Sequence, residues 1–245
     1  MILEHFTMKD SFGRNIDYMR ISITDRCNLR CKYCMPDGVE SLARWEILSL
    51  EEIEAIAICA AGLGISRIKV TGGEPLVRRD CCQLVKLLKS IPGIEKVTIT
   101  TNGVLLDRYL EPLLEAGIDG INISLDTLDP CMYEKITGFD RLACVMKTIE
   151  RSPGLPVRVK INAVSIDFSS MDGEGCSGPG GSWWKELVEL TGRYPVDVRF
   201  IEMMPIGYGK QFKTINHKEL LEEMHREYPG LAKDHTEHGY GPAVY

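Results

Sequence analysis

Residues 67–100 read RIKVTGGEPLVRRDCCQLVKLLKSIPGIEKVTIT, and this stretch decides the fold class. RIKVT at 67–71 and KVTIT at 96–100 are short runs rich in β-branched residues, which predicts two strands. Between them, Asp80 opens a segment through Leu88 that predicts a helix. A strand, a helix and a second strand in this order form a parallel βαβ unit with a right-handed crossover. The stretch therefore indicates an α/β fold.

The same alternation continues along the rest of the chain. Further strand-forming runs lie at 18–24 (YMRISIT), 120–125 (GINISL), 157–164 (VRVKINAV) and 198–203 (VRFIEM). Helical signals fill the gaps: a capping box of Ser49 and Glu52, the segment 105–116, the cap Asp129-Pro130, and the segments 184–190 and 216–228. Six strands in this pattern predict an α/β chain folded as a partial (β/α)6, TIM-like barrel. A doubly wound open sheet is the alternative.

Polar and apolar residues alternate along five of these strands. In the run at 67–71, for example, Ile68 and Val70 share one face, whereas Lys69 and Thr71 share the other. Parallel strands that are covered on both faces are usually continuous apolar runs, so a polar face predicts a barrel interior that holds a polar ligand. An antiparallel sheet with one face in water would show the same alternation, but the intervening helices argue against it. The strand at 198–203 breaks the pattern.

Three cationic side chains, Arg20, Lys69 and Lys160, belong to this polar face. Their convergence in a barrel interior favours an anionic substrate such as a phosphate ester. The net charge of the whole chain is −6, which argues against a general nucleic-acid binder. The 245 residues contain neither an apolar run long enough to span a bilayer nor a signal-peptide pattern, so we expect a cytoplasmic protein without a membrane partner.

Three of the nine cysteines are tightly spaced, as Cys27-x3-Cys31-x2-Cys34, directly after the first strand. In a reducing compartment such a group indicates metal binding rather than disulfides. Three thiolates ligate three irons of a [4Fe–4S] cubane and leave the fourth iron open to a ligand. Structural zinc is the rival, but it usually takes four Cys or His ligands in two pairs, and no second pair follows. The basic residues between the cysteines are expected to favour the thiolates: Arg26, Arg30 and Lys32.

Motifs also follow the carboxyl ends of other strands, where the chemistry of parallel barrels takes place. Gly72-Gly73-Glu74-Pro75 follows the strand at 67–71. Paired glycines let a backbone approach a ligand closely, and the Glu74 carboxylate is suited to an ammonium group. The motifs TNG, SLD and EMMP follow three further strands, those at 96–100, 120–125 and 198–203.

These phrases together resemble one protein family. TDRCNLRCKYCMP (24–36), VTGGEPLVRRD (70–80), TITTNG (98–103), INISLDTLD (121–129) and RFIEMMPIG (199–207) are similar to the radical S-adenosylmethionine (SAM) superfamily and, within it, to the GTP 3′,8-cyclase family of molybdenum cofactor biosynthesis. The similarity runs from about Phe12 to Gly209, with a further match in GYGPAVY at 239–245. The cysteine trio indicates the superfamily, and the longer phrases indicate the cyclase.

The resemblance implies a lyase with a defined chemistry. A reduced [4Fe–4S] cluster on Cys27, Cys31 and Cys34 would cleave SAM, and the 5′-deoxyadenosyl radical would cyclise GTP to (8S)-3′,8-cyclo-7,8-dihydroguanosine 5′-triphosphate. Positions matched to the family imply SAM contacts at Tyr33, Gly73, Ser124 and Met204, and Gly72 and Glu74 complete the GGEP part of that site. The same matching implies GTP contacts at Arg20, Lys69, Thr100 and Lys160. The family typically has arginine where this chain has Lys69, which keeps the charge but loses the planar fork.

The resemblance also predicts domains and partners. Residues 1–209 would form the radical SAM core, with an atypical Gly/Ser-rich insertion at 165–184, and residues 210–245 would begin a truncated C-terminal region. The second cysteine trio of the family, which holds another [4Fe–4S] cluster, is not encoded, so one cluster is expected. The family implies GTP, an electron donor of the reductase or flavodoxin type, cyclic pyranopterin monophosphate synthase and a second copy of the chain as partners. The alternative functions are a radical SAM enzyme acting on another anionic substrate and a non-catalytic iron–sulfur or zinc module.

Overall fold

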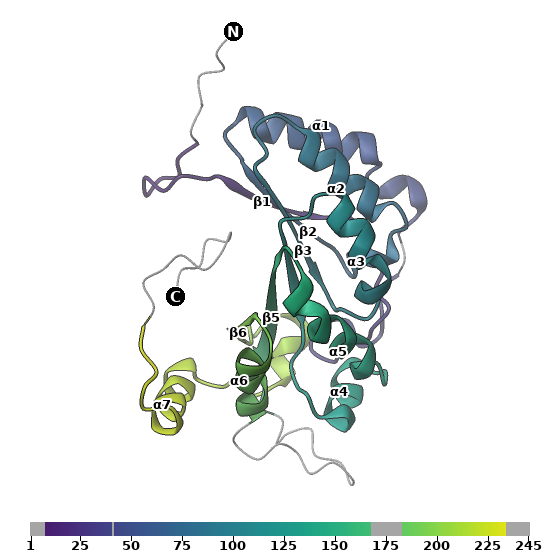
Figure 1. Cartoon of the computed structure of the whole chain (residues 1–245). Coiled ribbons are helices and arrows are strands. Elements are labelled where there is room, and N and C mark those ends of the chain that lie inside the picture. Colours follow the sequence, from purple (N-terminus) through teal and green to yellow (C-terminus); the bar gives the residue numbers. More distant parts are fainter. Residues whose placement is uncertain (1–7, 41, 168–182, 234–245) are drawn as a thin grey trace.

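The computed structural model describes residues 8–40, 42–167 and 183–233. Six strands within these ranges form one parallel sheet (Figure 1). The strands are β1 (Tyr18–Ser22), β2 (Arg67–Thr71), β3 (Lys96–Thr101), β4 (Gly120–Ser124), β5 (Arg158–Ser165) and β6 (Val196–Glu202). Their order in the sheet is their order in the chain. A doubly wound sheet would reverse direction at a switch point, and this sheet does not. The predicted partial (β/α)6 barrel is confirmed.

Helices connect successive strands, as the alternating sequence predicts, and one more helix follows the last strand. They are α1 (Leu50–Gly62), α2 (Cys81–Ser90), α3 (Leu106–Glu115), α4 (Pro130–Thr137), α5 (Leu142–Arg151), α6 (Trp183–Arg193) and α7 (His217–Glu227). Figure 1 shows α1 to α5 in a row on one side of the sheet, which is therefore its covered side. The sequence did not predict α5: Gly138, in the left-handed conformation (φ 80°), ends α4, and a second helix completes the crossover to β5.

Two of the three predicted helix starts are built as expected. The Ser49 hydroxyl accepts a hydrogen bond from the Glu52 amide at 3.2 Å, and the Glu52 carboxylate accepts one from the Ser49 amide at 2.7 Å. Asp129 accepts from the Met132 amide at 2.6 Å, with proline in the first turn. Asp80 differs, because its carboxylate makes no cap and pairs with the Arg78 guanidinium at 2.7 Å instead.

The core lies between the apolar face of the sheet and the covering helices. Val70, Val97, Ile99, Ile123 and Ile161 are fully buried on that face. The helices meet them with apolar stripes at helical spacing, such as Leu106, Leu110 and Leu113 of α3. Each fully buried Leu or Ile contributes about 1.5–3 kcal/mol relative to an exposed one. This packing fixes the strands, and with them the side chains on the other face.

The opposite, polar face carries side chains in layers, because neighbouring strands are paired in register. One layer joins Lys69, Thr98, Gly120 and Arg158, and the next joins Thr100, Asn122, Lys160 and Asp197. A third aligns Ser124, Asn162 and Arg199. The predicted polar interior is therefore confirmed, and β6 continues it through Asp197 and Arg199. The predicted strand began at Val198, whereas β6 begins at Val196, so the prediction left Asp197 out of the strand.

Three remaining features complete the description. Within the described residues, no helix is both long enough and apolar enough to cross a membrane. Cys131, to which no role was assigned from the sequence, is disulfide-bonded. Most of the predicted insertion at 165–184, including Cys176, and the GYGPAVY match at 239–245 lie outside the described residues.

Candidate functional site

The cysteine loop follows β1 and is held against the end of α4. The backbone amides of Arg30 and Lys32 donate to the carbonyls of Thr137 and Ile136, at 2.8 and 2.9 Å. The Arg30 guanidinium braces the loop from inside, because it donates to the carbonyls of Cys27 and Leu29 at 2.9 and 2.8 Å. Cys27 and Cys31 are half-buried in this loop, and Cys34 is exposed. The three cysteines therefore lie in one loop after the carboxyl end of β1.

Burial, rather than the basic residues, dominates the ionisation of the three thiols. Burial is the largest cause that raises the pKa of Cys27, Cys31 and Cys34. The negative charges of Asp126, Cys27 and Cys34 raise the pKa of Cys31 further. Arg26 and Lys32 are exposed, and Arg30 only slightly offsets the shift at Cys27. The expected effect of neighbouring cations is therefore present only as a minor contribution of Arg30 at Cys27, and the pKa of all three thiols is raised overall.

The donor set fits a cubane better than a single metal ion. Thiols that repel one another as thiolates are stabilised when they bind iron, because the metal neutralises their charges. Among residues 8–40, 42–167 and 183–233, no three or more His, Cys, Asp or Glu side chains converge on a point that suits one metal ion. Zinc needs such convergence, whereas the ligands of a cubane bind three different irons. The three thiols of this loop can therefore serve as the ligands of a cubane.

The paired glycines of GGEP bring the end of β2 against the segment that leads into Cys27. The amides of Gly73 and Glu74 donate to the carbonyls of Thr24 and Arg26, each at 2.7 Å. A side chain at Gly72 would put a Cβ atom 2.7 Å from the Thr24 carbonyl oxygen, and one at Gly73 would overlap the Arg26 carbonyl oxygen. The two glycines are thus required for contact between the GGEP loop and the segment that leads into Cys27. The sequence had indicated contact with a ligand instead.

The Glu74 carboxylate is buried and engaged within the protein. It accepts hydrogen bonds from the Thr101 hydroxyl at 2.7 Å, the Asn102 amide at 2.7 Å and the Leu76 amide at 3.0 Å. Burial raises the pKa of this carboxyl group, and the three donors oppose that shift. Glu74 therefore ties the end of β2 to the end of β3. The sequence had predicted a contact with an ammonium group for Glu74, and it did not indicate this structural role.

A small pocket lies between the cysteine loop and the end of β4. Cys31, Tyr33, Ser124, Asp126 and Tyr133 are among the residues that line it. The Tyr33 hydroxyl donates to the Asp126 carboxylate at 2.7 Å, and the Val164 amide donates to the same carboxylate at 2.8 Å. Burial raises the pKa of Asp126 to about 6. Two predicted SAM-binding residues, Tyr33 and Ser124, are thus brought beside Cys31.

Met204 lies elsewhere, in the loop after β6, where 64% of its surface is exposed. It is absent from the residues lining the pocket of Tyr33 and Ser124. The same loop does reach the cysteine loop, since the Tyr208 hydroxyl donates to the Asp37 carboxylate at 2.7 Å. The first and last strands of the open barrel are thereby linked at their carboxyl ends.

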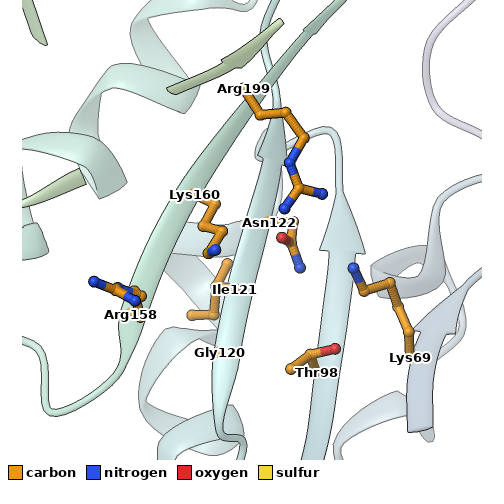
Figure 2. A pocket seen from close by; sticks show the side chains of 8 residues that line it. All are labelled: Lys69, Thr98, Gly120, Ile121, Asn122, Arg158, Lys160 and Arg199. Atoms are coloured by element: carbon orange, nitrogen blue, oxygen red, sulfur yellow. The ribbon is translucent and has the colours of Figure 1, made fainter. Parts of the chain in front are cut away.

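Basic side chains line a second pocket on the polar face of the sheet. Lys69, Arg158, Lys160 and Arg199 contribute the positive charges, and Figure 2 shows Lys69 and Arg199 pointing toward Asn122 from opposite sides. Burial lowers the pKa of Lys69 to about 8, and the charges of Arg20, Arg199 and Lys160 lower it too. Arg158 and Lys160 also pair with the Asp197 carboxylate, at 3.3 and 3.6 Å. A bound anion would stabilise the charge of Lys69, which its cationic neighbours disfavour.

Comparison with known proteins identifies the family. Residues 21–172 match the model of the radical SAM superfamily. A GTP 3′,8-cyclase from Clostridium perfringens is 41% identical over 239 residues, which are 97% of this chain and 71% of that protein. The chain belongs to the radical SAM superfamily and, within it, to the GTP 3′,8-cyclase family.

Other relatives agree with the assignment to the GTP 3′,8-cyclase family. The enzyme of that name from Alkaliphilus oremlandii is 42% identical over 97% of this chain and 71% of its own length. Molybdenum cofactor biosynthesis protein 1 of Drosophila melanogaster is 42% identical over 91% of this chain, which is 38% of that longer protein. The similarity thus covers nearly the whole chain and extends beyond the span from about Phe12 to Gly209 that the motifs indicated.

Solved radical SAM structures share the fold. SuiB of Streptococcus suis bound to S-adenosylmethionine superposes with a TM-score of 0.69 at 23% identity, over 87% of this chain and 48% of SuiB. The structure of anSMEcpe with bound AdoMet gives 0.56 at 18% identity, over 75% of this chain and 50% of its own. Identities this low show the common fold alone, and this chain spans about half of each structure.

Sequence reasoning missed several residues of this radical SAM site. Arg199, Asn122 and Arg158 line the basic pocket without having been predicted, and the RFIE phrase around Arg199 was the available signal. Asp126 was part of the SLD motif but received no role. Of the predicted GTP contacts, Lys69 and Lys160 line the pocket, whereas Arg20 lies beside Lys69 in register and Thr100 beside Asn122.

Proposed function

We propose that this radical SAM enzyme binds one [4Fe–4S] cluster through Cys27, Cys31 and Cys34, cleaves SAM and cyclises GTP to (8S)-3′,8-cyclo-7,8-dihydroguanosine 5′-triphosphate. Membership of the GTP 3′,8-cyclase family supports the reaction. The observation that carries the proposal is the combination of a three-thiol loop and a basic pocket on one sheet. When bound, the cluster and SAM supply a 5′-deoxyadenosyl radical, which removes hydrogen from C3′ of GTP before C3′ joins C8.

The residues around the cysteine loop hold SAM and the loop in position. We assign contacts with SAM to Tyr33, Gly72, Gly73, Glu74, Ser124 and Met204. Glycines at 72 and 73 let the end of β2 pack against the segment that leads into Cys27, and Glu74 fixes the course of the loop through its three internal donors. Asp126 fixes the Tyr33 ring through the 2.7 Å hydrogen bond. The chain thereby sets the geometry of the SAM site before SAM binds.

The basic pocket binds the phosphates of GTP. We assign this role to Arg20, Lys69 and Lys160, with Thr100 as a neutral hydrogen-bonding residue. Lys69 is buried, so its ammonium group lacks full hydration and gains from contact with an anion. The pocket binds GTP only while Lys69 and its neighbours are protonated. Binding at several points orients the ribose and lowers the entropic cost of the reaction.

Partners follow from the same proposal. Reduction of the cluster needs an electron donor of the reductase or flavodoxin type, and the product passes to cyclic pyranopterin monophosphate synthase. A second copy of the chain forms a homodimer. Residues 1–209 act as the radical SAM core and 210–245 as the start of a C-terminal region.

An anaerobic assay tests the proposal. The protein is incubated with reductant, SAM and GTP, and 5′-deoxyadenosine and GTP are followed by chromatography. Formation of deoxyadenosine that depends on GTP, with matching loss of GTP, is expected. Deoxyadenosine without loss of GTP would favour another anionic substrate, which the basic pocket would also accept. Colourless protein that contains zinc would favour the non-catalytic module.

A further inference from the structure

Asn102, in the TNG motif after β3, contacts the cysteine loop. Its side-chain Nδ2 lies 3.8 Å from Cys27 Sγ and 2.8 Å from Asn28 Oδ1. The first contact is a long N–H···S hydrogen bond, and the second anchors the same amide to the neighbouring residue. An Asn side chain has two N–H donors, so both contacts are made at once.

The orientation of the Asn102 amide is determined by its other contacts. Its Oδ1 accepts a hydrogen bond from the Val104 amide at 3.1 Å, so the oxygen must point away from the sulfur. Its backbone amide donates to the buried Glu74 carboxylate at 2.7 Å. Glu74 is held in turn by the Thr101 hydroxyl. The N–H donor is therefore directed at Cys27 by a network that runs through the ends of β2 and β3.

Hydrogen bonding to the three thiols is asymmetric. Within the described ranges 8–40, 42–167 and 183–233, the Cys27 sulfur accepts a hydrogen bond from the Asn102 side chain and one from the Leu29 amide at 3.4 Å, whereas the backbone hydrogen bond to the Cys31 thiol comes from its own residue. The donor in the Leu29 bond is a backbone amide of the loop, so replacing the Leu29 side chain leaves the bond in place. The Asn102 bond comes from a side chain in the loop after β3, so a substitution at Asn102 can remove it.

We propose that Asn102 is a positioning residue that raises the reduction potential of the cluster through its hydrogen bond to Cys27. Reduction adds negative charge to the cluster and its thiolates, and an N–H donor to a ligand sulfur stabilises that charge. Loss of the donor makes the cluster harder to reduce. The inference rests on the proposed cluster at Cys27, Cys31 and Cys34.

The test is a dye-mediated redox titration of the reconstituted protein, followed by electron paramagnetic resonance without SAM or GTP. Iron and sulfide are measured first in the unchanged protein and in each variant. Asn102→Ala is expected to lower the equilibrium constant for reduction by about tenfold, which is about 59 mV for one electron. Asn102→Asp keeps the size and the acceptor for Val104 but replaces the donor with a charge, so its potential is expected to fall further.

Asn28→Asp is the matched control. It also places a carboxylate beside Cys27, but it keeps an acceptor for Asn102 and leaves the N–H···S bond intact. Its potential is expected to fall less than that of Asn102→Asp. An unchanged potential in Asn102→Ala, or equal shifts in the two Asp variants, would overturn the role of Asn102. Unchanged protein without iron and sulfide would instead refute the proposed cluster, and this inference with it.

Discussion

The Tyr33 hydroxyl donates a 2.7 Å hydrogen bond to the Asp126 carboxylate, across 93 positions of sequence. It joins the cysteine loop to the carboxyl end of β4. The same carboxylate accepts a bond from the Val164 amide at the end of β5, so three segments meet at one buried group. The loop that carries the three thiols is thereby fixed to the sheet from which the polar pocket is built.

This relationship predicts unequal losses of stability for two substitutions at Asp126. Asp126→Ala leaves the Tyr33 hydroxyl and the Val164 amide unpaired, and it should lower the free energy of unfolding by about 1–3 kcal/mol. Asp126→Asn keeps an acceptor for Val164 and a hydrogen-bonding group for Tyr33, so it should change stability far less. Urea denaturation of the iron-free protein measures both. Equal losses in the two variants would contradict the role assigned to the hydrogen bonds.

The same pair gives a pH dependence with a definite sign. The folded pKa of Asp126 is raised from 3.8 to about 6, so between these values the native state binds more protons than the unfolded state. Stability therefore falls as pH rises from 4 to 6 and then levels off. Asp126→Asn removes this contribution, so its stability relative to the unchanged protein should improve over that interval. A constant difference between pH 4 and 7 would refute the raised pKa.

The close approach at Gly73 predicts that alanine is not tolerated there. The new Cβ would overlap the Arg26 carbonyl oxygen and lie 2.7 Å from that of Asp25, so the segment leading into Cys27 must move. Overpacking of this kind costs about 1–3 kcal/mol. Gly73→Ala should hold substantially less iron after anaerobic reconstitution.

Gly62→Ala is the matched control for Gly73→Ala. Gly62 is the last residue of α1, and a Cβ there meets nothing within 4 Å. This variant should bind as much iron as the unchanged protein. Full iron content in Gly73→Ala would show that the loop tolerates the displacement.

The buried ammonium of Lys69 predicts how GTP affinity depends on pH. Its pKa is lowered from 10.5 to about 8, chiefly by burial. If only the protonated form binds phosphate, the dissociation constant should rise about tenfold between pH 7 and pH 9. The sign is clear, because loss of a proton removes a positive charge from the pocket. Isothermal titration calorimetry with GTP measures this dependence.

Lys69→Arg separates this effect from the titration of GTP itself. Arginine stays protonated throughout this interval. The variant should bind GTP with a much flatter pH dependence than the unchanged protein. If both proteins show the same rise in dissociation constant, the titrating group is not Lys69.

The sequence predicted the architecture because the fold repeats a local pattern. Alternation of β-branched strands with capped helices defines each βαβ unit, and the polar residues at every second position define the lumen. The failures were also local in origin. Val198 was taken as the start of the last strand, which left out Asp197, and the break at Gly138 concealed that two helices connect β4 to β5.

Contacts between motifs were beyond the reach of the sequence. GGEP, TNG and SLD were recognised as motifs, but their mutual contacts depend on loop conformation. Glu74 reaches Asn102 across 28 positions, and Asn102 reaches Cys27 across 75. The direction of the thiol pKa shifts was also beyond the sequence. Burial outweighs the neighbouring charges, and burial is known only from the structure.

The most direct test of the central claim is the spectrum of the reduced cluster with and without SAM. Anaerobically reconstituted protein should contain about four iron and four sulfide ions per chain, and SAM should shift its electron paramagnetic resonance signal. Cys31→Ala should lose both the cluster and the response to SAM. Protein without iron and sulfide, a signal unchanged by SAM, or SAM cleavage by Cys31→Ala would contradict a three-cysteine cluster with an open iron.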